Sequence, residues 1–488
     1  MRPRPRRPRH RRDPHRRRWH AGAARTRPIR RGPGRDTRRS HENAHIAKLL
    51  TSGGGPRGPW SASRDPDGSD ILAQVEISAS GFTLRGAGRP RNDDAYLVDE
   101  SLGLFAVCDG LPHAGPGPAA AERALDAIAH HVRSEPHRDD ATEAAGILRR
   151  AFEAANEVVY AAGRRAGQPY ATTCTAVLVQ GDTATLAHVG NGRVYLFRND
   201  RLDLLTDDHD YRHEAVRNGI LTPHQALRSP FARRLTRAVG MRDTVAVDTL
   251  RIPLLDGDRL LLCTDGTYGC LDRIDPRGLL LGAHADPAEA LVRIAIEHDA
   301  SDDATSVVLT VRADAPDQRT RKTRVGLALR AIEHVPLFAD LTLRERYAIL
   351  DLFRPVTVGP GHPIVRQGDP GDSLYVVLDG LVDVRRGSKR VASLGAGAHF
   401  GEMALLSKRP RSATVTSRAP THLLEMSRRD FLDLVARDAT LGAKVLWRLA
   451  QMLSLRLDDL YALVPDEGRD TAALSILSPF GDDDPDAT

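Results

Sequence analysis

Four acidic sites each lie where an apolar, strand-like run begins or ends, so the fold must bring distant strand ends together. The sites are Asp93–Asp94, Asp109, Asp265 and Asp302–Asp303. An aspartate that follows an apolar strand and precedes a glycine, as Asp109 and Asp265 do, projects a hard oxygen ligand from a rigid sheet edge. Several such edges that converge form an anionic pocket, which is stable only around Mg²⁺ or Mn²⁺.

The pattern between these sites predicts a sheet protein with few helices. Short β-like runs cover Gly103–Cys108, Thr172–Val179, Thr183–Val189, Arg193–Arg198, Arg259–Cys263 and Ser306–Val311. Two Ala-rich segments, Pro118–Val132 and Thr142–Ala162, carry apolar residues at helical spacing. Because strands outnumber helices and short turns join many of them, we expect an antiparallel β-sandwich flanked by helices.

A second folded unit is predicted from about residue 331 to 464. Turn residues recur at Gly359–Gly361, Gly368–Asp372 and Asp379–Gly380, which is typical of a small β-roll. A helix over about Thr440–Leu463 should close it, either by packing on its own β-roll or by forming a dimer seam. The predicted fold class is therefore α+β multidomain, with the sandwich followed by a β-roll with helices.

Composition divides the chain further. Residues 1–72 form an Arg/Pro-rich tail with too few apolar residues to offset the entropy of ordering, so we expect disorder there. The sandwich should cover 73–313, a polar linker 314–330, the β-roll unit 331–464 and an acidic tail 465–488. The first forty residues hold seventeen Arg and two Asp; removing this surplus of 15 from the net charge of +6 leaves about −9 elsewhere.

Charge and hydropathy also limit the partners and the compartment. The basic tail could contact nucleic acid without specificity. The alternatives are a solvated tail without a partner and a stretch that was included through a wrong start assignment. No apolar run is long enough to cross a bilayer and no apolar leader is present, so neither membrane insertion nor secretion is expected. Four scattered cysteines predict free thiols in a reducing cytoplasm.

The acidic sites and the motifs around them resemble the metal-dependent type 2C protein phosphatases. The matching segments, in family order over about residues 73–313, are Arg89–Asp94, Phe105–Gly110, Ala171–Thr173, His188–Arg193, Leu235–Gly240, Thr264–Gly266 and Asp302–Thr305. The resemblance implies hydrolysis of phosphoserine and phosphothreonine at two Mn²⁺ or Mg²⁺ ions, without a covalent intermediate.

The resemblance also implies a role for each site residue. Asp109 would bridge both metals, and the carbonyl of Gly110 would bind one of them. Asp265 and Asp302 would complete the shell of the first metal, with Asp93 or Asp94 oriented at the second. Arg89 would hold the phosphate, because a guanidinium offers a bidentate, always-charged clamp.

Three departures from the family pattern are visible. Leu111–Gly115 lacks the Gly-Gly that commonly follows Asp-Gly, and its His113 could replace the histidine of eukaryotic members. Asn191 stands where the family has an aspartate, which weakens an accessory third metal site. Asp93 is shorter than the usual Glu or Gln. The alternative to an active enzyme is a pseudophosphatase that retains the fold.

The β-roll unit resembles cyclic-nucleotide-binding domains of the catabolite activator protein type, over about residues 334–460. The matching cassette contains Gly401, Glu402, Met403, Ala404, Arg411, Ser412 and Ala413. The resemblance implies that Glu402 binds the ribose 2′-hydroxyl and that Arg411 neutralises the cyclic phosphate, while backbone N–H groups near Gly401 complete the cradle. Ser412 favours cyclic AMP, with cyclic GMP as the alternative, and Asp458–Asp459 could contact the base.

Together these features predict a cytoplasmic phosphoprotein phosphatase whose activity a cyclic nucleotide sets. Coupling would pass through the linker 314–330 to the metal site or its flap, placed at about Asp207–Leu235. A transcription regulator is disfavoured because no helix-turn-helix pattern follows the last helix. The remaining alternative is a non-catalytic cyclic-nucleotide receptor built on a pseudophosphatase fold.

Overall fold

The computed structural model describes most of the chain between residues 75 and 462. The described ranges are 75–111, 117–135, 141–168, 170–271, 273–274, 276–282, 286–299, 301–313 and 317–462. The basic tail 1–72, the acidic tail 465–488, His113 and the side chains of Asp458–Asp459 lie outside the described residues. Within the described part, every helix is too short or too polar to span a membrane.

The first folded unit contains two antiparallel sheets of five strands each. One sheet has the order β1 (Glu76–Leu84), β10 (Ala304–Arg312), β9 (Arg259–Cys263), β6 (Arg193–Arg198) and β7 (Arg201–Leu204). The other has the order β2 (Asp94–Asp99), β3 (Leu104–Asp109), β4 (Cys174–Gln180), β5 (Thr183–Val189) and β8 (Asp248–Pro253). All six predicted strand runs form strands in these sheets.

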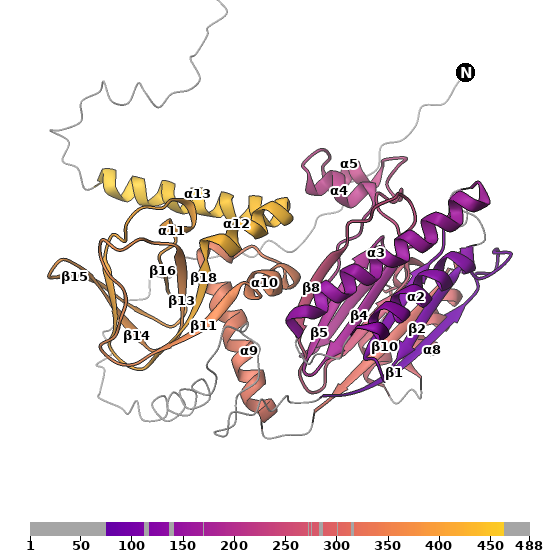
Figure 1. The fold of residues 1–488 in the computed structure, drawn as a ribbon, viewed down its shortest axis with the longest axis horizontal. Helices are drawn as coiled ribbons and strands as arrows, with labels where there is room; N and C mark the ends of the chain where they lie inside the picture. Colours follow the sequence, from indigo (N-terminus) through magenta and orange to yellow (C-terminus); the bar gives the residue numbers. More distant parts are fainter. Residues whose placement is uncertain are drawn as a thin grey trace, which may run out of the picture. The chain divides into compact units, whose positions relative to one another are not determined.

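Helices cover the outer faces of both sheets. Helices α2 (Gly117–Ser134) and α3 (Ala141–Ala166) cover one sheet, and α7 (Pro276–Leu281) and α8 (Pro287–His298) cover the other. The short helices α4 (Tyr211–Arg217) and α5 (Pro223–Leu227) lie between β7 and β8, and α6 (Asp265–Tyr268) follows β9. The long helices α2 and α3 lie side by side over the sheet that contains β4 and β5 (Figure 1). Both long helices were predicted from their 3.6-residue apolar spacing, and the structure confirms them.

The apolar strands are buried on both faces because each sheet lies between the other sheet and a helical layer. In β3, Leu104 and Ala106 pack under the helices, whereas Phe105 and Val107 face the second sheet. In β9, successive leucines alternate in the same way between the inter-sheet core and the layer that contains α8. The structure therefore confirms the predicted antiparallel sandwich flanked by helices.

The second unit contains two antiparallel sheets of four strands each, with helices before, between and after the strands. One sheet has the order β11 (Phe353–Val358), β18 (Thr421–Ser427), β13 (Ser373–Asp379) and β16 (His399–Phe400). The other has the order β12 (Pro363–Val365), β17 (Thr414–Ser417), β14 (Leu381–Arg386) and β15 (Lys389–Gly395). Tyr375 and Leu423 from one sheet pack with Val382 and Val415 from the other, which forms the predicted roll. Its helices are η1 (Pro336–Phe338), α10 (Leu343–Leu350), α11 (Met403–Leu406), α12 (Arg428–Arg437) and α13 (Ala439–Ala462).

The segment predicted as a polar linker is largely helical. Helix α9 (Asp317–His334) begins inside it, and Val325 and Ala328 of that helix are buried in the core. Arg321 is also buried, where it pairs with the Asp182 carboxylate and donates to the carbonyl of Leu254 at 3.1 Å. From Arg321 onward, α9 is therefore packed against the first unit.

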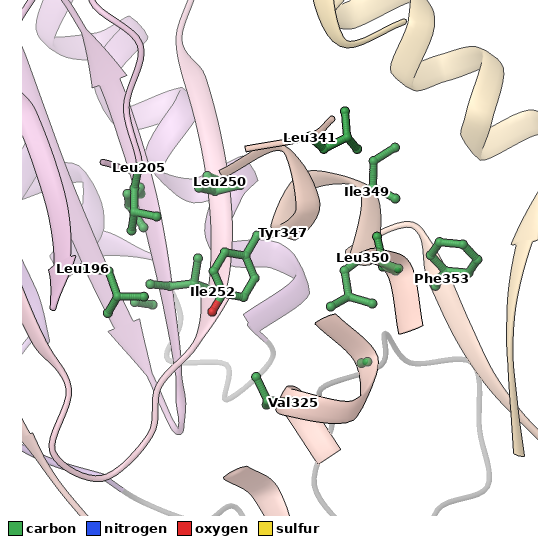
Figure 2. Close-up of a cluster of buried hydrophobic side chains, with 14 of the residues drawn as sticks. Leu196, Leu205, Leu250, Ile252, Val325, Leu341, Tyr347, Ile349, Leu350 and Phe353 are labelled. Atoms are coloured by element: carbon green, nitrogen blue, oxygen red, sulfur yellow. The ribbon is translucent and has the colours of Figure 1, made fainter. Parts of the chain in front are cut away.

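One hydrophobic cluster includes side chains from the sandwich, from α9 and from the β-roll unit. Figure 2 shows Leu196 and Ile252 of the sandwich with Val325 of α9 and Tyr347 of α10. The Tyr347 side chain is fully buried, and its hydroxyl accepts a hydrogen bond from Arg198 at 2.6 Å. The two folded units thus share a continuous core.

Candidate functional sites

The ends of β2 and β3 bring two predicted site residues together. Asp94 and Asp109 are direct partners in the antiparallel register of these strands. The backbone N–H of Asp109 donates to the Thr173 hydroxyl at 3.1 Å, and its carbonyl accepts from the Thr173 N–H at 2.8 Å. The N–H of Gly110 donates to the Asp93 carbonyl at 3.0 Å. This pairing fixes the backbone from which the Asp109 carboxylate projects.

Asp94 is held by two hydroxyl groups, one from the residue that follows β9 and one from β10. Its Oδ2 accepts from the Thr264 hydroxyl at 2.8 Å and from the Thr305 hydroxyl at 2.7 Å. Burial raises the pKa of Asp94 to about 8, although both hydroxyl bonds oppose that shift. Asp94 is therefore fixed between β9 and β10 at the acidic site.

Asp265 opens the short helix α6 directly after β9. One of its oxygens accepts from the Asn191 side-chain amide at 3.1 Å. A Cβ at Gly266 would lie 2.0 Å from the Asp303 carbonyl oxygen, so the Asp-Gly step allows α6 to pass close to the other acidic loop. Asn191, predicted as a departure that weakens a third metal site, here contacts a predicted ligand of the first metal.

The two aspartates before β10 have different surroundings. Asp302 forms an ion pair with Arg89, whose side chain is 23% exposed. Asp303 is buried, and its two oxygens accept from the backbone N–H groups of Gly86 and Asp93 at 2.8 Å each. Asp302 therefore faces the charged site, whereas Asp303 fixes the backbone of the Arg89–Asp93 loop.

The carboxylates act on one another electrostatically. Burial raises the pKa of Asp109 well above its usual range, and the nearby carboxylates of Asp94, Asp265 and Asp302 raise it further, against the opposing charge of Arg89. Burial also raises the pKa of Asp265, and burial with the Asp265 charge raises that of Asp302. Carboxylates crowded in this way are fully ionised only beside added positive charge. The oxygen donors fit Mg²⁺ or Mn²⁺.

The second predicted site lies at the start of α11. The Arg411 guanidinium donates to the Ser373 carbonyl at 2.8 Å and lies 5.9 Å from the centre of the Tyr375 ring. Gly401 has a φ of 86°, and a Cβ there would lie 2.7 Å from both the Arg411 guanidinium and the Ser373 oxygen. Glu402 follows it and is buried. The structure thus brings Gly401, Glu402 and Arg411 together.

Other predicted cassette residues surround this centre. Met403 and Ala404 form the first turn of α11; Met403 is 40% exposed and Ala404 is buried. Ser412 is exposed in the turn before β17, and Ala413 is half-buried beside it. Aromatic rings line the neighbouring interior, where Tyr375 and Phe400 stack with centroids 5.1 Å apart. The cassette combines a buried acid, an arginine and an aromatic surface.

Comparison with known families identifies both units. The family model of protein phosphatase 2C matches residues 81–298, and that of the cyclic nucleotide-binding domain matches residues 355–438. Over residues 81–298 the chain is a protein phosphatase 2C domain. Its second unit contains a cyclic nucleotide-binding domain.

Curated relatives match each domain separately. The phosphatase domain is 29% identical over 239 residues to serine/threonine phosphatase stp of Listeria monocytogenes, covering 48% of this chain and 94% of that protein. It is 29% identical to the serine/threonine protein phosphatase PstP of Mycobacterium tuberculosis, over 46% of this chain and 43% of PstP. The cyclic nucleotide-binding domain is 37% identical over 130 residues to the cAMP-dependent protein kinase regulatory subunit of Dictyostelium discoideum, covering 25% of this chain and 39% of that protein.

Among solved structures, the PPM Ser-Thr phosphatase MsPP from Mycobacterium smegmatis in complex with cacodylate is 31% identical and has a TM-score of 0.43. The match covers 49% of this chain and 99% of that one.

Two residues that position the phosphatase site were given no role in the sequence analysis, although the family-matching segments include them. Thr264, directly after β9, and Thr305 of β10 hold Asp94; their places within the strand-end motifs Thr264–Gly266 and Asp302–Thr305 were the available signal. In the flap, oxygen or nitrogen atoms of Asp208, Asp210 and His213 lie within 4.8 Å of one another. Their present roles are structural, since Asp208 pairs with Arg193 and Asp210 caps α4.

Proposed function

We propose that this protein hydrolyses phosphoserine and phosphothreonine in proteins at a site with two Mn²⁺ or Mg²⁺ ions, under control of cyclic AMP. The observation that carries the catalytic part is the convergence of Asp94, Asp109, Asp265 and Asp302, whose pKa values are all raised by burial and, for Asp94, Asp109 and Asp302, by the neighbouring carboxylates. The phosphatase activity that the names of the relatives state supports the same assignment.

Each residue of the proposed site has a separate task. Asp109, Asp265, Asp302 and the Gly110 carbonyl would hold the ions, with Asp93 or Asp94 oriented at the second one. Bound ions of this kind polarise the phosphoryl oxygens and lower the pKa of water. Arg89 lies at the edge of the acidic group, where its guanidinium can bind the phosphate of a substrate with two parallel hydrogen bonds.

Cyclic AMP is the ligand that we assign to the second domain. Arg411 supplies the charge for the cyclic phosphate, and buried Glu402 supplies an acceptor for a ribose hydroxyl. The aromatic pair of Tyr375 and Phe400 lies in the same interior. The name of the Dictyostelium relative, a regulatory subunit that responds to cAMP, supports the choice over cyclic GMP.

The test uses the full-length protein and a phosphothreonine peptide. Hydrolysis is measured with Mn²⁺ and with EDTA, in the presence and absence of cyclic AMP. Asp109→Ala should lower turnover by at least about 100-fold, because it removes a carboxylate that is proposed to hold the ions. A 100-fold loss corresponds to about 2.7 kcal/mol of transition-state stabilisation. The matched control is Asp99→Ala, since Asp99 lies at the far end of the same strand pair.

Binding of cyclic AMP is measured separately by calorimetry. Arg411→Ala should weaken it by about 10- to 100-fold, because charge-assisted hydrogen bonds are lost. Arg418→Ala is the control, since Arg418 is exposed on the same domain and pairs with Asp383 at 3.7 Å. Tight cyclic AMP binding without any turnover would overturn the catalytic proposal in favour of a receptor on a pseudophosphatase fold, and attention would turn to Leu111 and Asn191.

A further inference from the structure

Helix α12 is attached at its first residue to the cyclic-nucleotide cassette. The side chain of Arg428 donates to the carbonyls of Leu405 and Leu406, the last residues of α11, at 3.2 and 3.3 Å. The backbone N–H of Arg428 donates to the Asp372 carbonyl at 2.6 Å, next to the start of β13. These hydrogen bonds join the end of α11 directly to the first residue of α12.

The other end of α12 carries an acidic side chain toward the phosphatase domain. Asp438 directly follows α12. Its Oδ1 accepts from the Leu441 N–H in the first turn of α13 at 2.9 Å. Its Oδ2 lies 3.8 Å from the Arg344 guanidinium. A helix of ten residues is about 15 Å long, so α12 spans that distance between the cassette and Asp438.

Arg344 of α10 is shared between the two domains. Its guanidinium lies 2.9 Å from the Asp207 carboxylate and 3.9 Å from that of Asp248, both of the phosphatase domain. The arginine side chain is 15% exposed. Because solvent screens partly buried pairs weakly, a change at any one of its three acidic partners alters the interaction with the other two.

Asp207 is the first residue of the flap and connects it to the metal site. Its carboxylate also lies 3.7 Å from Arg217, the last residue of α4, and its carbonyl accepts from His188 at 3.1 Å. Two residues further on, the N–H of His209 donates to the Gly190 carbonyl at 2.7 Å. Asn191, which follows Gly190 in the chain, donates to Asp265 at 3.1 Å.

We propose that Arg344 couples the cyclic-nucleotide cassette to the flap of the phosphatase, through α12 and the competition of Asp438 and Asp207 for one guanidinium. The proposal rests on the function proposed above and names the contact through which its regulation acts. Ligand binding at Arg411 rearranges α11, α11 moves α12, and the position of Asp438 sets how tightly Arg344 holds Asp207. Arg344 is a positioning residue, since it touches neither ligand nor predicted metal site.

The test compares Arg344→Gln with Arg346→Gln in the full-length protein. Arg346 lies on the same helix and pairs with Glu333 of α9 at 3.2 Å, so it controls for loss of an α10 arginine. Two readouts are taken with and without cyclic AMP: Mn²⁺-dependent hydrolysis of the phosphothreonine peptide and hydrogen exchange of the α4 amides. Calorimetry verifies that both variants still bind cyclic AMP.

In the wild type we expect cyclic AMP to change turnover by a factor within the usual range of allosteric coupling, about 5- to 150-fold, and to change exchange in α4. Arg344→Gln should nearly abolish both effects, while cyclic AMP affinity and basal turnover stay within about threefold of the wild-type values. Asp207→Asn should give the same loss, and the double variant should add little, because both substitutions remove the Arg344–Asp207 ion pair.

The outcomes separate this proposal from the proposed function. Cyclic AMP effects that persist in Arg344→Gln at wild-type size would overturn the coupling and leave the regulated phosphatase intact. A protein without turnover whose α4 exchange responds to cyclic AMP only when Arg344 is present would retain the coupling and overturn the catalytic proposal. An α4 helix that never responds to bound cyclic AMP would overturn the coupling outright.

Discussion

At the scale of single residues, adjacent aspartates perform different tasks because their oxygens face different partners. Asp303 uses both oxygens on buried backbone N–H groups, whereas Asp302 faces Arg89 and the other carboxylates. The sequence presents the pair as one acidic motif. The family resemblance named Asp302 as the metal ligand, and the structure adds that Asp303 supports the loop.

This difference predicts that substitution of Asp303 lowers stability, whereas substitution of Asp302 weakens metal binding. Asp303→Ala should lower the free energy of unfolding of the metal-free protein by about 2 kcal/mol or more, because two buried N–H groups lose their acceptors. Asp302→Asn should change it by less than about 1 kcal/mol, since its lost ion pair is partly exposed, but should weaken Mn²⁺ binding. Urea unfolding and Mn²⁺ titration measure the two effects; equal destabilisation by both variants would contradict the assignment.

At the scale of secondary-structure elements, strand β5 and the flap meet through two buried histidines. His188 of β5 and His209 of the flap have ring centroids 4.6 Å apart. The Nε2–H of His188 donates to the Asp207 carbonyl, and its Nδ1 accepts from the Thr175 hydroxyl. Burial lowers the pKa of His188 well below its usual range, and His209 and Arg237 lower it further, against Asp248 and the Asp207 bond. Burial also lowers the pKa of His209 against its bond to Asp248.

Acid should therefore weaken the contact between β5 and the flap. Both histidines stay neutral in the folded state below the unfolded pKa of about 6.5, so the unfolded state binds more protons and stability falls as the pH drops from 6.5. Each contributes at most about 1.4 kcal/mol per pH unit. His188→Asn should reduce the slope between pH 6.5 and 5, as urea unfolding would show. An unchanged slope would mean that folding does not change the pKa of His188.

At the scale of the whole molecule, the shared core makes the two domains one unit of stability. Tyr347 of α10 is fully buried and bonds to Arg198 of β6, which also pairs with Asp258. Arg251 of β8 pairs with Asp351 at the end of α10. These contacts join the elements that follow α9 to both sheets of the phosphatase domain.

Loss of the Tyr347 side chain should separate the unfolding of the two domains. Tyr347→Ala leaves a cavity and removes one acceptor of Arg198, which keeps its ion pair with Asp258. The change should cost about 3 to 5 kcal/mol. Calorimetric scans of the wild type should show one transition that both Mn²⁺ and cyclic AMP raise. The variant should show two, each raised by a single ligand. Two independent transitions already present in the wild type would refute the shared core.

The sequence predicted what local patterns encode. Strand-end motifs located the acidic site, because a strand followed by Asp-Gly presents its carboxylate at an edge whatever lies around it. The contacts between the domains were not predictable in this way: Arg344 and Asp207 are surface-type residues far apart in the chain. Most of α9 fell in the predicted linker 314–330 because that segment begins with polar and charged residues, and the burial of the helix depends on the core against which it packs.

The packing of Tyr347 also bears on how such a protein can be rebuilt or can diverge. A phosphatase truncated before α9 would leave Leu196 and Ile252 without the aliphatic and aromatic neighbours that cover them. Such a fragment would be prone to aggregate, and a transplanted sensor would restore solubility only if its first helices filled the same space. Recombination between relatives should therefore succeed when the crossover preserves α9 and α10 together with the sheets beneath them.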